Sequence, residues 1–337
     1  MRLLKKGRFQ EAIDHSIQKV DPEKRPVRYH KGLARAYALI GDDIQAEKEY
    51  KNALGYINRK SRKELKLSDF DVMDELALLS VRIGNWQQVK ALVSRSLQLR
   101  VRWWRKNDPV NFRPYLPLGM LHFNEGSIDS AKYYLNTFKD NIRFSNYTSH
   151  LDVDQYADVF QVLADIAAVE NDLRLALHLA KKSARLQRHV WTKKEVGKNY
   201  ADRVKALNTL AWIYIQKGDF KEGEKIIIKA DRMLASVRGN LLLNIDTHLI
   251  KSRLEYQKEN ISESKHLIME AMQLQIEFVQ RTFIYLSEYE KENIYPKFKS
   301  NSDRILSRVY DLYKNEYISD HDPVLAKTLD YIINTKA

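Results

Sequence analysis

Two stretches of similar sequence decide the fold: IGDDIQAEKEYKNAL at residues 40–54 and KGDFKEGEKIIIKA at residues 217–230. Each contains a glycine, Gly41 or Gly218, and a small residue five positions later, Ala46 or Gly223. Glycine adopts positive φ and ends a helix within a residue or two. The small residue lies where a second helix crosses the first, because a larger side chain would push the two axes apart. The pattern therefore predicts a hairpin of two α-helices.

The same pattern recurs along the chain. A turn residue is followed, five, nine and twelve positions later, by apolar or small residues at helical spacing. The further turn residues are Gly7, Gly84, Gly126, Asn171 and, most weakly, Glu259. Such internal repetition is typical of a solenoid, in which each hairpin buries its apolar face only against its neighbours. We expect six or seven antiparallel helix pairs that form a right-handed superhelix with a concave inner surface.

These copies resemble the tetratricopeptide repeat (TPR) family, whose standard repeat length separates Gly7 from Gly41. The resemblance covers residues 1–275 and implies an all-α, TPR-like solenoid. It also implies a protein-interaction scaffold that binds a protein partner on its concave face. From the repeat register, Tyr37, Lys205 and Asn208 are the candidates for that contact. Six residues before Gly7 are too few for a leading helix, so we expect the natural start to lie upstream of Met1.

Residues 276–337 follow a different pattern and are predicted to form a helical capping or linker segment. Ser287 and Glu290 have the spacing of a capping box at a helix start. The segment is similar to the junction that precedes a CHAT domain, a caspase-like peptidase domain. The matching residues are Leu286-Ser287-Glu288, Pro323, Ala326, Tyr331 and Thr335-Lys336-Ala337. The resemblance implies the regulatory arm of a CHAT-type peptidase, by analogy in bacterial defence, with the catalytic domain absent from this chain. The alternative is a polar helix pair that caps a stand-alone TPR regulator.

The net charge of +13 favours an anionic partner. Three basic clusters follow predicted second helices, and equivalent points of a solenoid lie along one edge. Their cations would neutralise phosphates, and exposed Trp would stack on unpaired bases. This nucleic-acid edge is the alternative to a solvated surface whose cations complement helix dipoles. Its candidate residues are Arg59, Arg62, Arg100, Arg102, Trp103, Trp104, Arg105, Arg188, Trp191, Lys193 and Lys194.

No enzymatic motif accompanies these features. The chain has no cysteine, which excludes a cysteine nucleophile, a disulfide framework and cysteine-ligated zinc. Its nine histidines are not paired at metal-ligand spacing, and phosphate-binding glycine loops are absent from the sequence. We expect no cofactor, no metal, no membrane span and a cytoplasmic location; the sequence does not indicate an oligomeric state. The acidic group Asp69, Asp71, Asp74 and Glu75 is interpreted as helix capping.

Overall fold

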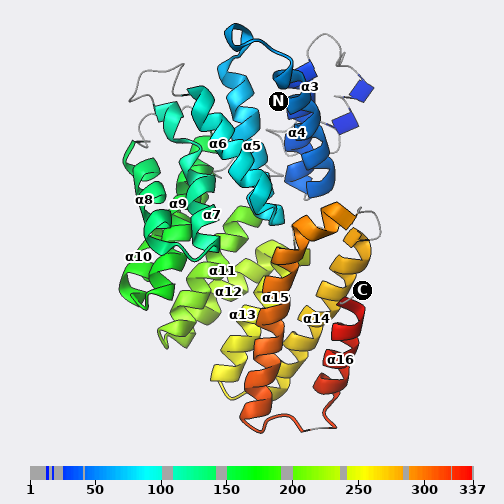
Figure 1. Ribbon diagram of the computed structural model, residues 1–337. Helices are drawn as coiled ribbons and strands as arrows, with labels where there is room; N and C mark the ends of the chain where they lie inside the picture. Colours follow the sequence, from blue (N-terminus) through cyan, green and yellow to red (C-terminus); the bar gives the residue numbers. More distant parts are fainter. Residues whose placement is uncertain are drawn as a thin grey trace. The chain divides into compact units, whose positions relative to one another are not determined.

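The computed structural model is built of α-helices (Figure 1). It describes residues 13–14, 17–18, 26–40, 42–100, 109–141, 150–190, 200–235, 241–283, 288–319 and 321–335. Within these residues the helices are α3 (Pro26–Ile40), α4 (Asp43–Asn58), α5 (Leu67–Ile83), α6 (Trp86–Arg100), α7 (Tyr115–Asn124), α8 (Ile128–Asn141), α9 (His150–Val169), α10 (Leu173–Val190), α11 (Tyr200–Gln216), α12 (Phe220–Leu234), α13 (Leu241–Gln257), α14 (Ile261–Phe283), α15 (Glu288–Lys314) and α16 (Pro323–Thr335). Two short 3-10 helices, η1 (Arg62–Glu64) and η2 (Pro109–Phe112), precede α5 and α7. The predicted all-α architecture is confirmed.

Each hairpin turn centres on one residue, which we call the turn position. The backbone has positive φ at five of the predicted turn positions, which are Gly84, Gly126, Asn171, Gly218 and Glu259. The next residue donates its backbone N–H to the carbonyl five residues back, as from Asn85 to Ser80 (2.8 Å) and from Asp219 to Tyr214 (2.9 Å). Asp42 makes the same bond to Tyr37 (3.0 Å). These bonds satisfy carbonyls that a helix end leaves without a partner.

The residue after the turn position also begins the second helix. The Asp42 carboxylate accepts a hydrogen bond from the backbone N–H of Gln45 at 3.1 Å, and Asp172 accepts one from Leu175 at 3.0 Å. Asn85 caps α6 in the same way. Two consecutive residues therefore end one helix and start the next, which fixes the register of both.

The predicted packing stripe is buried in every copy that the structure describes. Five residues after the turn position lie Ala46, Val89, Ala131, Ala176, Gly223 and Ser264, all buried. In α7, Gly119 allows a particularly close approach. A Cβ atom placed there would lie 2.6 Å from Cγ of Leu135 on α8. The small residues thus set the distance between the two helices of a hairpin.

The chain divides into two compact units, residues 1–166 with 185–199 and residues 167–184 with 200–337. In the first, α3 to α7 share a core that includes Tyr50, Phe70 and Met73. In the second, one cluster joins α11, α12 and α13, and another joins α13 and α14 to α15 and α16.

The predicted division at residue 275 lies inside α14, and it stays a prediction as a domain boundary. A turn that the sequence pattern did not reveal joins α15 to α16. There Glu316 has φ of 59°, and Tyr317 donates to the Leu312 carbonyl at 2.9 Å.

Two glycine-to-alanine substitutions should change stability in opposite directions. Gly119→Ala forces the new methyl group against Leu135 and should lower the free energy of unfolding by about 1–3 kcal/mol. Gly55 lies within α4, and apart from its chain neighbours and the backbone of its own helix no heavy atom lies within 4 Å of the point that an added methyl group would occupy. Gly55→Ala should therefore raise the free energy of unfolding by about 0.5–1 kcal/mol. Urea unfolding followed by circular dichroism measures both. Equal shifts for the two variants would contradict the close approach of α7 and α8.

Candidate partner-binding surfaces

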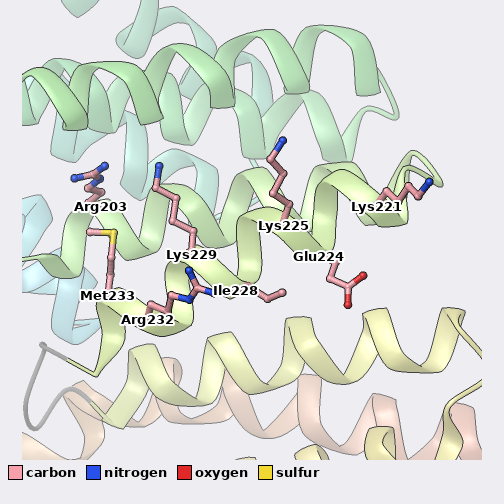
Figure 2. Close-up of a pocket in the computed structure, with 8 residues that line it drawn as sticks. All are labelled: Arg203, Lys221, Glu224, Lys225, Ile228, Lys229, Arg232 and Met233. Atoms are coloured by element: carbon pink, nitrogen blue, oxygen red, sulfur yellow. The ribbon is translucent and has the colours of Figure 1, made fainter.

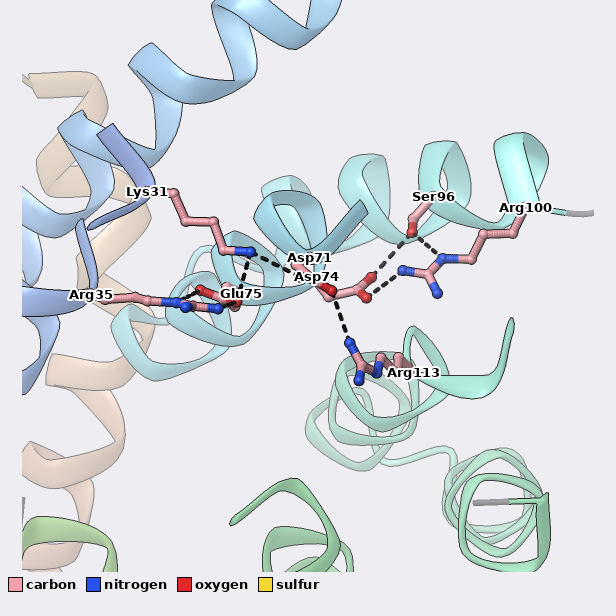
Figure 3. A network of polar contacts seen from close by, with 8 residues as sticks. All are labelled: Lys31, Arg35, Asp71, Asp74, Glu75, Ser96, Arg100 and Arg113. Atoms are coloured by element: carbon pink, nitrogen blue, oxygen red, sulfur yellow. Dashed lines mark hydrogen bonds and ion pairs between the residues drawn. The ribbon is translucent and has the colours of Figure 1, made fainter. Parts of the chain in front are cut away.

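Ion pairs join the first helices of consecutive hairpins in the first unit (Figure 3). The Asp71 carboxylate on α5 lies between two cations from the neighbouring hairpins. Lys31 Nζ on α3 is 2.9 Å from one oxygen, and an Arg113 guanidinium nitrogen, just before α7, is 2.8 Å from the other. These side chains are between 11% and 23% exposed. Their charges are therefore directed at one another.

A second carboxylate, Glu75, lies one turn further along α5. Arg35 on α3 binds it through Nε at 2.7 Å and through a second guanidinium nitrogen, and the Tyr50 hydroxyl donates to it at 2.9 Å. Burial, with the Glu75 charge beside it, raises the pKa of Tyr50 well above its ordinary value. The hydroxyl thus remains a hydrogen-bond donor to Glu75 at neutral pH.

The third pair is buried. Arg100, at the end of α6, pairs with Asp74 on α5, and its side chain is 1% exposed. Ser96 donates to Asp74 at 3.1 Å, and the guanidinium lies 5.2 Å from the centre of the Phe70 ring. Burial raises the pKa of Asp74 to about 6, although Arg100 opposes that shift. Arg100 was predicted to be a surface cation for nucleic acid, and that prediction is wrong because the carboxylate holds it in the interior.

The capping interpretation of the acidic group is correct for only one of its members. Asp69 accepts the backbone N–H of Lys66 at 2.8 Å and therefore caps α5. Asp71, Asp74 and Glu75 lie deeper in the helix and pair instead with cations. The reason is geometric: only a residue in the first turn reaches the free backbone N–H groups.

The second unit repeats this geometry. Asn208 on α11 donates to Asp246 on α13 at 2.9 Å and to the Thr247 hydroxyl at 2.9 Å. Arg304 on α15 is 2.8 Å from the other oxygen of Asp246. Lys31 and Asn208 each lie ten residues before a turn glycine, so they occupy equivalent positions in their repeats. The first helices therefore use this face to hold neighbouring repeats together.

The predicted concave-face residues have different environments. Asn208 is 1% exposed and its amide nitrogen donates to Asp246 and Thr247, so its side chain offers no surface for the predicted partner contact. Tyr37 is partly buried against the core of the first unit. Lys205 is exposed, and its role stays a prediction.

Few of the predicted nucleic-acid residues have side chains within the described part of the chain. Arg59 is exposed, with its guanidinium 5.5 Å from the centre of the Tyr56 ring. Arg62 lies in η1 and Arg188 in α10, but their side chains are outside the described residues. So are Arg102, Trp103, Trp104, Arg105, Trp191, Lys193 and Lys194. Apart from Arg100, the edge stays a prediction.

A basic surface that the sequence reasoning missed lies on the second helix of the α11–α12 hairpin (Figure 2). It is a shallow, open groove, and Figure 2 shows Lys225 and Lys229 extending from the same side of α12. We call it the basic groove. Its lining residues are Arg203, Lys221, Glu224, Lys225, Ile228, Lys229, Arg232 and Met233. Five of these eight side chains are cationic and one is a carboxylate.

The carboxylate does not neutralise the groove, because it is engaged elsewhere. Glu224 accepts a hydrogen bond from Lys258, just after α13, at 2.6 Å. Lys225 is 3.4 Å from Glu222, at the edge of α12. Among the described residues, no carboxylate forms an ion pair with Lys221, Lys229 or Arg232. Ile228 lies between these cations and is 44% exposed.

Counting from the turn position shows why this helix is basic on one face. Three, seven and eleven residues after Gly218 lie Lys221, Lys225 and Lys229, all exposed. The same positions of α10, counted from Asn171, hold Arg174, His178 and Lys182, also exposed. In α8 they hold Asp129, Tyr133 and Thr137, and in α14 Ser262, His266 and Glu270. Among these four helices the all-basic row is thus specific to α10 and α12.

Two other kinds of feature bear on function. Across the described ranges, no cluster of three or more acidic or histidine side chains is arranged to hold a metal ion. In the same part of the chain, no helix is long and apolar enough to span a bilayer.

The comparisons with known proteins support the fold. No family model and no curated protein matches the sequence. Among solved structures, the Rap protein complexed with Competence and Sporulation Factor is 12% identical, with a TM-score of 0.55 over 89% of this chain and 85% of that one. BtubC (BKLC) from P. vanneervenii is 16% identical over 70% of this chain and 92% of that one, with a TM-score of 0.45. A Podosopora anserina putative kinesin light chain with TPR-like repeats is 14% identical over 65% of this chain and 100% of that one, with a TM-score of 0.45. The chain has an all-α, TPR-like repeat fold.

The buried pair yields a test of the first unit. Asp74→Leu leaves the Arg100 charge buried without its partner and should lower the free energy of unfolding by about 3–5 kcal/mol. The double variant Asp74→Leu/Arg100→Met replaces the pair by apolar side chains and should recover most of that loss. Urea unfolding at neutral pH gives both values. A double variant no more stable than Asp74→Leu would show that Arg100 does not depend on Asp74.

Proposed function

We propose that this chain is a protein-interaction scaffold and that the basic groove on α12 holds its partner. The groove is the observation that carries the proposal. It combines three exposed cations without acidic partners among the described residues, Lys221, Lys229 and Arg232, with a half-exposed isoleucine on the same helix. The polar residues on the first helices, by contrast, already bind one another.

The repeat fold supports this role in a general way. A stack of hairpins presents long, regular helix faces, and loss of one surface side chain leaves the stack intact. The Rap protein, which shares the fold over most of its length, was solved in complex with Competence and Sporulation Factor. That likeness concerns the fold, and the partner of this chain is argued from its own residues.

A finer assignment rests on sequence resemblance alone. Residues Pro323, Ala326 and Tyr331 match the junction before a CHAT domain, which favours a regulatory arm of a CHAT-type peptidase in bacterial defence. In such a protein, the partner bound to the repeats would control cleavage. Reading the frame beyond Ala337 in the source DNA decides this point.

Two matched variants test the scaffold and its surface. Lys225→Gln/Lys229→Gln/Arg232→Gln removes three cations from the basic groove. Lys48→Gln/Lys51→Gln/Lys90→Gln removes three cations from α4 and α6, so both variants lower the net charge equally. With nuclease-treated extract of the source organism, wild type and the second variant should retain the same protein, and the groove variant should lose at least about 80–90% of it.

Two results would contradict the proposal. The first is retention of nucleic acid alone from untreated extract and of no protein from nuclease-treated extract, which would favour the basic-edge alternative. The second is an equal loss of the protein partner in both variants, which would show generic attraction by net charge and no defined surface.

A further inference from the structure

From the basic groove we infer the chemical class of its partner: an acidic protein segment that carries an aliphatic side chain between its carboxylates. This inference rests on the proposed function and specifies the ligand of the same surface. It depends on three properties of the groove, namely the spacing of its cations, the apolar side chain between them, and the absence of aromatic rings from the described residues that line it.

The cations form a row along one helix. Lys221, Lys225 and Lys229 are spaced four residues apart, which places successive side chains about 6 Å from one another along α12. Arg232 continues the row one turn further. A segment with carboxylates at similar intervals would meet each cation in turn. Exposed pairs of this kind contribute little individually, so a row of several is required for useful affinity.

An exposed apolar side chain, Ile228, lies among these cations. Ile228 lies beside Arg232 on the visible side of α12, and Met233 lines the same groove (Figure 2). Ile228 is 44% exposed, whereas its neighbour Ile227 is buried. A purely polyanionic ligand gains nothing from this side chain. A peptide with a leucine or isoleucine between acidic residues would cover it and remove apolar surface from water.

The lining also argues against a nucleic acid as the ligand. Its eight residues contain no Tyr, Trp, Phe or His ring on which a base could stack. Glu224 interrupts the cations of the lining beside Lys221 and Lys225, whereas a nucleic acid carries a phosphate at every nucleotide. A peptide can instead place a neutral side chain opposite Glu224, which stays paired with Lys258, just after α13.

Three fluorescein-labelled probes test the inference by anisotropy with the full chain. The first is a peptide in which leucines alternate with pairs of aspartates or glutamates. The second has every leucine replaced by serine, and the third is an oligothymidylate of the same charge. Wild type should bind the leucine peptide about tenfold more tightly than the serine peptide. Both peptides should weaken by about tenfold in Lys225→Gln/Lys229→Gln/Arg232→Gln.

A single substitution isolates the apolar contact. Ile228→Ser should weaken the leucine peptide by about fivefold and leave the serine peptide unchanged. Ile44→Ser, at a 37% exposed isoleucine on α4, is the matched control and should change neither. Circular dichroism of both variants checks that each remains folded.

The outcomes separate this inference from the proposed function. Equal affinities for the two peptides, or an Ile228→Ser variant that binds the leucine peptide as wild type does, would overturn the acidic-aliphatic class. The proposed scaffold function would still stand if the groove variant loses the protein partner. Tighter binding of the oligothymidylate than of either peptide, with no protein retained from extract, would overturn both.

Discussion

The structure depends on one backbone feature, the left-handed residue that ends the first helix of a hairpin at every turn position that the structure describes. Gly84, Gly126 and Gly218 adopt this conformation without a steric penalty, and Asn171 tolerates it. The next residue donates its backbone N–H to a carbonyl of the first helix, and residues such as Asp42 and Asp172 also cap the second helix. The turn therefore fixes the positions of both helices. The other features of the repeats lie at fixed numbers of residues from the turn position. The small residues of the crossing, the ion pairs between repeats and the cations of α12 each occupy fixed positions in that count.

The sequence predicts those features of the fold that depend on adjacent residues. Gly218 and Asp219 are adjacent and have unusual conformational preferences, so they identify a turn without knowledge of the rest. Glu316 was missed because glutamate rarely adopts positive φ, and, unlike Glu259, it has no small residue five positions later. The ion pairs were missed for a different reason. Lys31 and Asp71 are distant in sequence and meet only when the hairpins stack.

The basic groove could be predicted from the sequence only in part. Its cations were visible in the sequence, but Glu222, Glu224 and Asp231 alternate with them and make α12 look evenly charged. Only their positions relative to Gly218 separate the exposed row from the residues that pair with neighbours. Asn208 and Arg100 were assigned to binding surfaces from the sequence, but both are buried polar residues that serve packing. Polar residues of the first helices thus join repeats, whereas the cations Lys221, Lys225 and Lys229 of α12 are exposed.

Hydrogen–deuterium exchange on the whole chain tests the central claim, that the outward face of α12 is the binding surface. With the acidic leucine peptide bound, we expect slower exchange in residues 220–234 and unchanged exchange in α3 and α5, whose polar residues already bind one another. Protection of α3 and α5 with no change in α12 would contradict the account. It would show that the partner displaces the ion pairs between repeats and binds the first helices instead.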